Sequence, residues 1–164
     1  MAHRKMNIRC DTIHPVLVVD RRRAWRQKLV YVLRADRKIK HYKGGRYNEP
    51  RKYENGGSRI IYIGETSVGK AKMGRPANSA VRKGERAFHE IGGVKRIEIH
   101  LVTATKRHGV QKSWEKLERG LLAAFLDKFA NLPCYNKQGK SYKIEDVDSY
   151  FSRNRLKAVI DDLS

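Results

Sequence analysis

The sequence has few of the residues that build a metal centre or a disulfide-stabilised fold. Its two cysteines, Cys10 and Cys134, form no Cys-x-x-Cys pair and no spacing suited to zinc. The six histidines are scattered, and none of them forms a His-Glu-x-x-His motif or another ligand pair. The sequence therefore argues against a structural zinc site, and the isolated cysteines fit a reducing compartment.

Long apolar segments are also lacking. No apolar run approaches the roughly 18 residues that a membrane-spanning helix needs. The basic segment 1–9 is not followed by the apolar stretch of a signal peptide. No segment pairs a basic helical face with exposed Trp or Phe, and there are no internal repeats. We therefore expect a cytoplasmic protein without a membrane partner.

Acidic residues are scarce relative to basic ones. The 164 residues include 37 Lys and Arg but only 17 Asp and Glu, which gives a formal net charge of +20 and a pI near 10.3. This excess favours a polyanionic partner, and nucleic acid is the first candidate. Residues 1–58 carry the denser charge, with 16 Lys and Arg against 5 Asp and Glu. The hydrophobic content of 40% is enough for one folded domain with a core.

The periodicity of apolar residues predicts a small α+β domain. We expect strands at 28–33, 59–64 and 95–103, with 16–19 as a further candidate edge strand. Helices are expected at 76–91 and 113–130, and within 144–163 as a C-terminal cap. Adjacent strands joined by a hairpin-like insertion should pair antiparallel. The prediction is a single domain over 1–164 with its core at about 28–136, built on a three-stranded mixed or antiparallel sheet flanked by helices. His100 falls on the polar side of the third strand and is expected to face solvent.

Basic residues alternate with aromatic ones in two segments that could contact nucleic acid. Segment 34–58 is long, polar and rich in glycine, and it carries Tyr42, Tyr47 and Tyr53 among its cations. Cations can meet phosphates there while tyrosines stack, although a floppy hairpin tip is the alternative. Segment 20–26 is either a solvated basic turn or a phosphate contact that uses Trp25 for stacking. The residues expected to contact DNA are Arg22, Arg23, Arg26, Lys43, Arg46, Arg51 and Lys52.

One acidic residue, Glu118, projects into the apolar stripe of a predicted helix. Residues of an α-helix turn by about 100° each, so Glu118 lies only about 40° from Trp114. The stripe consists of Trp114, Leu117, Leu121, Phe125 and Phe129. A carboxylate on the packed side of a helix costs free energy unless a cation meets it. The partner could be a metal ion, an arginine or a catalytic proton, which makes this chain a candidate enzyme.

Several motifs occur in the order found in one nuclease family. Tyr31 lies in the first predicted strand, Tyr62-Ile63-Gly64 in the second, arginines on the next helix, Glu118 on the following one, and Asn136 after that. This order resembles the GIY-YIG nucleases, which include homing endonucleases, excision-repair nucleases and some type II restriction enzymes. The resemblance covers about 28–136. Leu-Val replaces the usual Gly-Ile before Tyr31, and about thirty residues separate the two tyrosines where the family has a short turn.

The resemblance implies metal-dependent hydrolysis of phosphodiester bonds with a single Mg²⁺ or Mn²⁺ ligated by Glu118. Tyr31 would take a proton from water or position that water, and Tyr62 would hold the attacking water or the phosphate. Tyrosine titrates near pH 10, so Tyr31 could act as a base only if nearby cations lower its pKa.

A helix arginine would donate hydrogen bonds to the scissile phosphate. Arg82 is our first choice, with Arg75 and Arg86 as alternatives. Gly64 completes the Tyr-Ile-Gly motif, and Asn136 is expected to brace the backbone near the site without taking part in the chemistry.

The compact layout resembles the restriction endonucleases of this family. We expect DNA recognition to come from 1–27, 34–58 and the C-terminal segment, and we expect a homodimer on palindromic double-stranded DNA, because one active site per chain cuts one strand. The alternatives are a homing or repair nuclease and a basic nucleic-acid-binding protein without catalytic activity.

Overall fold

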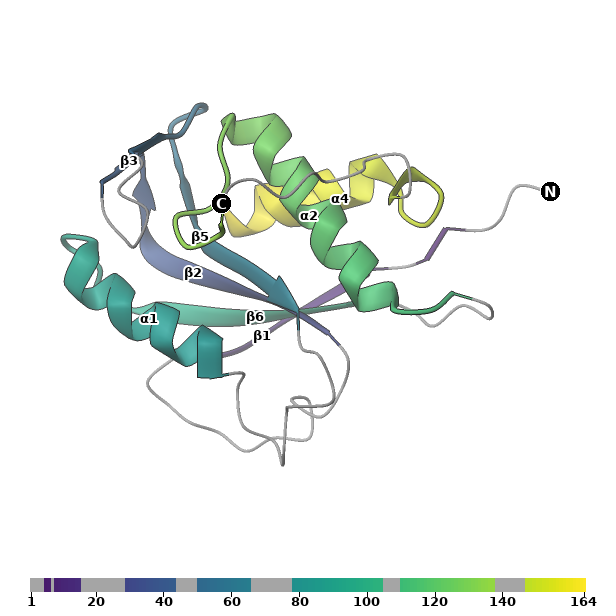
Figure 1. The fold of residues 1–164 in the computed structure, drawn as a ribbon, viewed down its shortest axis with the longest axis horizontal. Coiled ribbons are helices and arrows are strands. Elements are labelled where there is room, and N and C mark those ends of the chain that lie inside the picture. The colour runs from purple at the N-terminus through teal and green to yellow at the C-terminus, as the bar shows by residue number, and fades with distance from the viewer. Residues whose placement is uncertain are drawn as a thin grey trace.

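A computed structural model describes residues 5–6, 8–15, 29–43, 50–65, 78–104, 110–137 and 147–164. Four strands form one antiparallel sheet in the order β1 (Ile8–Pro15), β6 (Ile97–Ala104), β2 (Val30–Ile39) and β5 (Ser58–Glu65). Helices α1 (Asn78–Glu90), α2 (Ser113–Phe129) and α4 (Arg153–Leu163) flank this sheet (Figure 1). The predicted α+β fold with an antiparallel sheet between helices is confirmed.

The central sheet has one more strand than the sequence predicted. Strands β2, β5 and β6 are the three expected strands, and β1 pairs with the outer edge of β6. The candidate edge strand at 16–19 lies outside the described residues, while the observed edge strand covers the eight residues before it. Because β1 pairs with the outer edge of β6, this strand, the third one predicted, is an inner strand of the sheet.

The predicted contact loop begins as part of the sheet. Strand β2 continues to Ile39, and β3 (His41–Tyr42) pairs with β4 (Arg51–Lys52) in a separate two-stranded sheet. Tyr42 and Tyr53 are both buried, and the Tyr53 hydroxyl donates to the Leu132 carbonyl at 2.9 Å. In its described residues, the insertion is thus a packed hairpin and not an unstructured loop, while its contact with DNA stays a prediction. Tyr42 and Tyr53 supply core contacts, and Tyr47 lies outside the described residues.

Helix α2 buries the stripe that its sequence predicted. Leu117, Leu121, Phe125 and Phe129 are fully buried, and α2 contacts β5, β6 and β2. Helix α4 packs beside α2 (Figure 1). A Cβ atom at Gly120 would lie 2.9 Å from Val147 Cγ1, so glycine permits this close approach. The C-terminal helix was predicted within 144–163; α4 occupies the end of that segment, residues 147–148 are also helical, and 144–146 lie outside the described residues.

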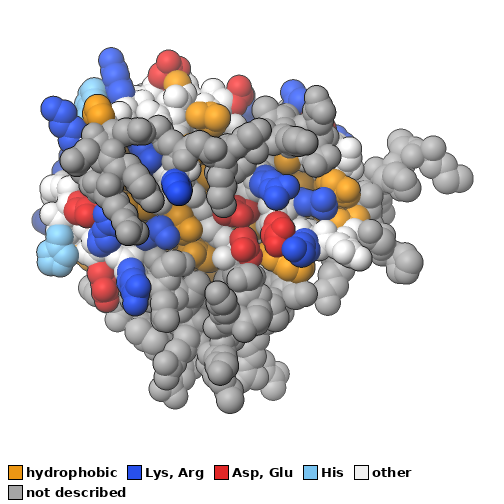
Figure 2. All heavy atoms as spheres, in the orientation of Figure 1, with side chains coloured by type: hydrophobic (Ala, Val, Ile, Leu, Met, Phe, Trp, Pro, Cys, Tyr) orange, Lys and Arg blue, Asp and Glu red, His pale blue; other side chains and the backbone are white. Residues whose placement is uncertain are grey.

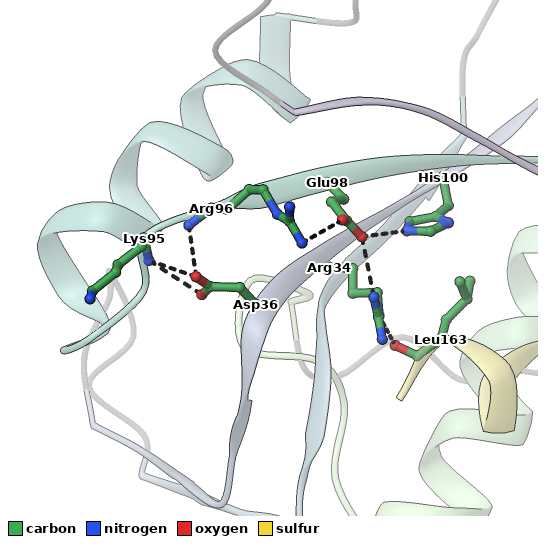
Figure 3. Close-up of polar contacts among 7 residues, drawn as sticks. All are labelled: Arg34, Asp36, Lys95, Arg96, Glu98, His100 and Leu163. Carbon is green, nitrogen blue, oxygen red and sulfur yellow. Dashed lines mark hydrogen bonds and ion pairs between the residues drawn. The ribbon is translucent and has the colours of Figure 1, made fainter.

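His100 is buried, in contrast to the prediction that it faces solvent. Its exposed fraction is 5%, because β6 lies between two strands and both faces of the sheet are covered. Figure 3 shows His100 Nε2 and Arg34 Nη1 converging on one oxygen of Glu98, each at 3.2 Å. Arg34 Nε also donates to the Leu163 carbonyl at 2.9 Å, which ties the end of α4 to the sheet.

Burial and pairing in this network shift two pKa values. Burial lowers the pKa of His100 below its usual value and outweighs the opposing effect of the neighbouring carboxylate. Burial raises the pKa of Glu98, but hydrogen bonds from His100 and Arg34 outweigh burial and leave this pKa below its usual value. Both shifts favour neutral histidine and ionised glutamate in the folded protein.

Candidate active site

Tyr31 and Tyr62 lie next to each other on one face of the sheet. Tyr31 in β2 pairs with Gly64 in β5, and Leu33 pairs with Tyr62, which makes the two tyrosines diagonal neighbours. Their ring centroids are 5.7 Å apart and the planes are inclined by 42°. Tyr31 is 1% exposed, whereas Tyr62 is only partly buried. The two strands therefore hold two phenols together at the edge of the core.

Gly64 provides the space that the tyrosine pair occupies. A Cβ atom at this position would lie 2.8 Å from the Tyr31 hydroxyl oxygen and 2.5 Å from Tyr62 Cε1. These separations are shorter than the roughly 3.5–4.0 Å of a normal contact between carbon atoms. Glycine is therefore required by close approach, and it allows the Tyr31 hydroxyl to lie against the β5 backbone.

Asn136 braces β5 between Tyr62 and Gly64. Its side-chain amide donates to the Ile63 carbonyl at 2.8 Å and accepts from the Ile63 N–H at 3.0 Å. The Asn136 side chain, 6% exposed, thus pairs with the free edge of β5 as a neighbouring strand would. The Tyr135 N–H donates to the Ile61 carbonyl at 3.0 Å and extends this pairing. Asn136 was expected to brace the backbone here, and these bonds do so.

Arg51 has a structural position that differs from its predicted contact with DNA. Only 5% exposed, it donates from Nη2 to the Asn136 carbonyl at 2.6 Å and from Nη1 to the Pro133 carbonyl. A guanidinium held by two buried carbonyls is not presented to a phosphate at the surface. Arg51 instead fixes the segment that carries Asn136, while Lys43 and Lys52 of the same hairpin are exposed.

Glu118 lies where the buried face of α2 opens toward solvent. The stripe is fully buried at Leu121 and Phe125, but it is only partly buried at Trp114 and Glu118 near the start of the helix. Glu118 is close enough to the tyrosine pair for its charge to act on Tyr62. The predicted inward orientation is thus present in a boundary position, which keeps the carboxylate accessible.

The environment of Tyr62 keeps its hydroxyl protonated. Burial is the main cause that raises the pKa of Tyr62 above its usual value, followed by the charge and hydrogen bonding of Tyr31. The charges of Glu118 and Glu65 act in the same direction. Tyr62 is therefore a hydrogen-bond donor at neutral pH. Glu65 directly follows Gly64 and is a second carboxylate near the pair that the sequence analysis did not include.

Of the arginines predicted to donate to a phosphate, Arg82 and Arg86 are described, and their role stays a prediction. Arg82 is exposed on the helix surface. Arg86 donates to Glu90 Oε1 from Nε at 3.0 Å and from Nη2 at 2.9 Å, and its guanidinium lies over the Tyr135 ring. Arg75 lies outside the described residues.

The α1 cation at the pair is Lys83, whose Nζ lies 3.9 Å from the centroid of the Tyr62 ring. Sequence reasoning missed this residue. One signal was available, because Lys83 precedes the buried Ala87 by four residues and so shares its side of the helix.

The basic residues predicted to contact DNA are only partly described. Arg22, Arg23, Arg26 and Arg46 lie outside the described residues. On the visible face, described basic side chains are spread among acidic ones (Figure 2). No described helix is long and apolar enough to cross a membrane.

Across the described ranges, no three His, Cys, Asp or Glu side chains gather as a metal-ligand cluster. Any divalent cation at Glu118 would need most of its ligands from water and substrate. A carboxylate that is partly buried and accessible fits such a cation, since Mg²⁺ in phosphoryl-transfer sites takes few protein ligands. No protein-family model, curated protein or solved structure matches this chain.

Proposed function

We propose that this protein is a metal-dependent endodeoxyribonuclease of the GIY-YIG type. One observation supports this function above the others. Tyr31 of β2 and Tyr62 of β5 lie together over Gly64, which leaves room for a phenol, and Glu118 of α2 is near enough for its charge to act on Tyr62. Asn136 fixes the backbone between Tyr62 and that glycine. Tyr31 packs in the core, so the features that packing leaves unexplained are the partly buried phenol of Tyr62 and the carboxylate of Glu118 near it.

Tyr62, Tyr31 and Glu118 have different roles in the proposed phosphodiester hydrolysis. Tyr62 stays protonated and donates a hydrogen bond to the attacking water or to a phosphoryl oxygen. Tyr31 is fixed against Gly64 and orients the water or accepts its proton. Glu118 would hold one Mg²⁺ or Mn²⁺, which supplies Lewis acidity and neutralises charge on the phosphate.

Double-stranded DNA is the substrate class that the charge favours. The net charge of +20 promotes binding to phosphates, and the exposed Lys43 and Lys52 lie on the β3–β4 hairpin. A type II restriction endonuclease acting as a homodimer on palindromic DNA is the finer form of the proposal. It rests on the resemblance of the motif order in the sequence to the restriction endonucleases of this family.

Cleavage of supercoiled plasmid tests this function. Wild-type protein should convert the plasmid to discrete open-circular or linear products with Mg²⁺, and should leave it intact with EDTA. Glu118→Gln should bind DNA with wild-type affinity and lose cleavage, because it removes the charge that holds the cation. Glu115→Gln is a matched control, since Glu115 lies on the same helix and pairs with Lys112 at 3.5 Å.

A basic nucleic-acid-binding protein without catalytic activity is the second candidate. The same net charge supports it. Binding of the plasmid without metal-dependent cutting by the wild-type protein would favour this candidate and end the nuclease proposal. Normal cutting by Glu118→Gln would instead refute the metal assignment alone.

A further inference from the structure

Lys83 is directed from α1 toward the proposed site. Its ammonium lies 3.9 Å from the centroid of the Tyr62 ring, and the side chain is half-buried. Gly84 and Ala87 are buried on the same helix, and these small residues let α1 approach the molecule closely at this point. Lys83 is therefore the α1 cation that the fold holds against the tyrosine pair.

The ammonium of Lys83 has N–H donors that the Tyr62 ring does not use. An ammonium carries three donors, and the face of an aromatic ring uses few of them. Within the described part of the chain, no carboxylate forms an ion pair with Lys83. Burial, and then the charge of Arg86, lower the pKa of Lys83 below its usual value. A cation in these surroundings gains by meeting an anion.

Hydrogen bonds to Glu90, at the C-terminal end of α1, fix the helix in this orientation. The Tyr42 hydroxyl donates to Glu90 Oε2 at 2.7 Å, and Arg86 donates to Oε1 of the same carboxylate. Glu90 follows Lys83 by seven residues, or about two helical turns, so the two share one side of α1. The hairpin thereby sets the rotation of α1 that brings Lys83 to Tyr62.

We propose that Lys83 is a catalytic residue that contacts the scissile phosphate, in the role that the sequence assigned to a helix arginine. This inference rests on the proposed nuclease function. The ammonium donates hydrogen bonds to a non-bridging phosphate oxygen and offsets the negative charge that develops there. The Lys83 ammonium lies over the Tyr62 ring, and the charge of Glu118 acts on the same tyrosine, so a cation for the phosphate and a carboxylate for the metal lie near one phenol.

Single-turnover cleavage by charge variants tests the role of Lys83. Lys83→Gln should slow cleavage by about 100-fold or more, as loss of one such donor does in other enzymes, and should weaken DNA binding only a few-fold. Lys83→Arg should recover much of the rate because a guanidinium also donates to phosphate. Lys95→Gln, which removes an exposed lysine, should cut as the wild type does.

The pH profile separates a chemical role from a structural one. Wild-type cleavage should decline toward alkaline pH, beginning below the usual lysine pKa of 10.5, as Lys83 loses its proton, whereas Lys83→Arg should show no such decline because arginine stays charged. Lys83→Met retains the apolar stem of the side chain, so it replaces Lys83→Gln in the cleavage assay if Lys83→Gln does not fold.

Wild-type rates in Lys83→Gln or Lys83→Met would overturn the inference while leaving the nuclease in place. Loss of activity in Arg82→Gln with full activity in Lys83→Gln would return the role to the arginine. A wild-type protein that cuts no DNA would instead refute the proposed function itself.

Discussion

Replacement of Gly64 by alanine tests the geometry of the tyrosine pair. The added Cβ atom would lie 2.5 Å from Tyr62 Cε1, and 2.8 Å and 2.9 Å from the hydroxyl oxygen and Cζ of Tyr31. Relief to ordinary contact requires displacements of about 1 Å. Tyr31 is fully buried on an inner strand, so it cannot move without shifting β2.

The expected cost follows from overpacking. Forcing one methyl group into a filled core typically costs about 1–3 kcal/mol, and we expect Gly64→Ala to lower the free energy of unfolding by that amount. If the protein is a nuclease, a displacement of about 1 Å at the phenols should also slow cleavage by about 100-fold. Urea unfolding followed by circular dichroism measures the first effect, and plasmid cleavage measures the second.

Gly92→Ala is the matched control for this experiment. No atom lies within 4 Å of a Cβ built at Gly92, and its backbone is outside the left-handed region. We expect a change of stability within about 0.5 kcal/mol for this variant. If Gly64→Ala unfolds at the same urea concentration as Gly92→Ala and the wild type, the Tyr31 hydroxyl does not occupy the space above Gly64.

Three further predictions concern the bracing residue, the buried histidine and the basic hairpin. Asn136→Ala leaves two backbone groups of β5 without their partner and should cost about 2–4 kcal/mol in urea unfolding; an unchanged midpoint would show that Asn136 does not brace the strand. The contribution of His100 to the free energy of unfolding should be fully present near pH 7.5 and should be lost toward pH 5. The pKa of His100 is lowered in the folded protein, so the unfolded chain takes up the proton more readily as the pH falls. The lowered pKa of Glu98 extends the loss of stability below pH 4.5, the usual pKa of a glutamate. His100→Gln should flatten the fall between pH 7.5 and 5 in urea unfolding, and an equally steep fall in that variant would contradict the assignment. Alanine at Lys43 or Lys52 should lower the slope of log affinity for DNA against log salt by about one unit per lost phosphate contact, and unchanged slopes would remove the hairpin from the interface.

Local periodicity was sufficient to predict α1, α2, three of the four strands of the central sheet and several side-chain positions. The stripe of α2 is buried because a helix with apolar residues at this spacing has one packed face, and Glu118 lies at its accessible end. The antiparallel pairing of β2 with β5 follows from their connection, and it brings Tyr31 beside Tyr62. Asn136 was recognised from its place in the motif order.

Positions that depend on tertiary packing could not be predicted in this way. His100 alternates with apolar residues as a surface residue would, but β6 lies between β1 and β2, and its successive residues 99–102 are all buried, so both faces of the strand are covered. Arg51 resembles a surface cation in the sequence and is buried because two loop carbonyls face it. The choice between Arg82 and Lys83 depends on the rotation of α1 about its axis, which contacts with the hairpin determine.

Uptake of Mn²⁺ is the most direct measurement of whether Glu118 holds a divalent cation beside the tyrosine pair. Electron paramagnetic resonance reports free Mn²⁺ in the presence of the protein and a phosphorothioate duplex that resists hydrolysis. We predict that the wild type and Glu115→Gln bind about one Mn²⁺ per chain beyond the amount held by the duplex, and that Glu118→Gln binds none. Equal uptake by Glu118→Gln and the wild type would contradict the account.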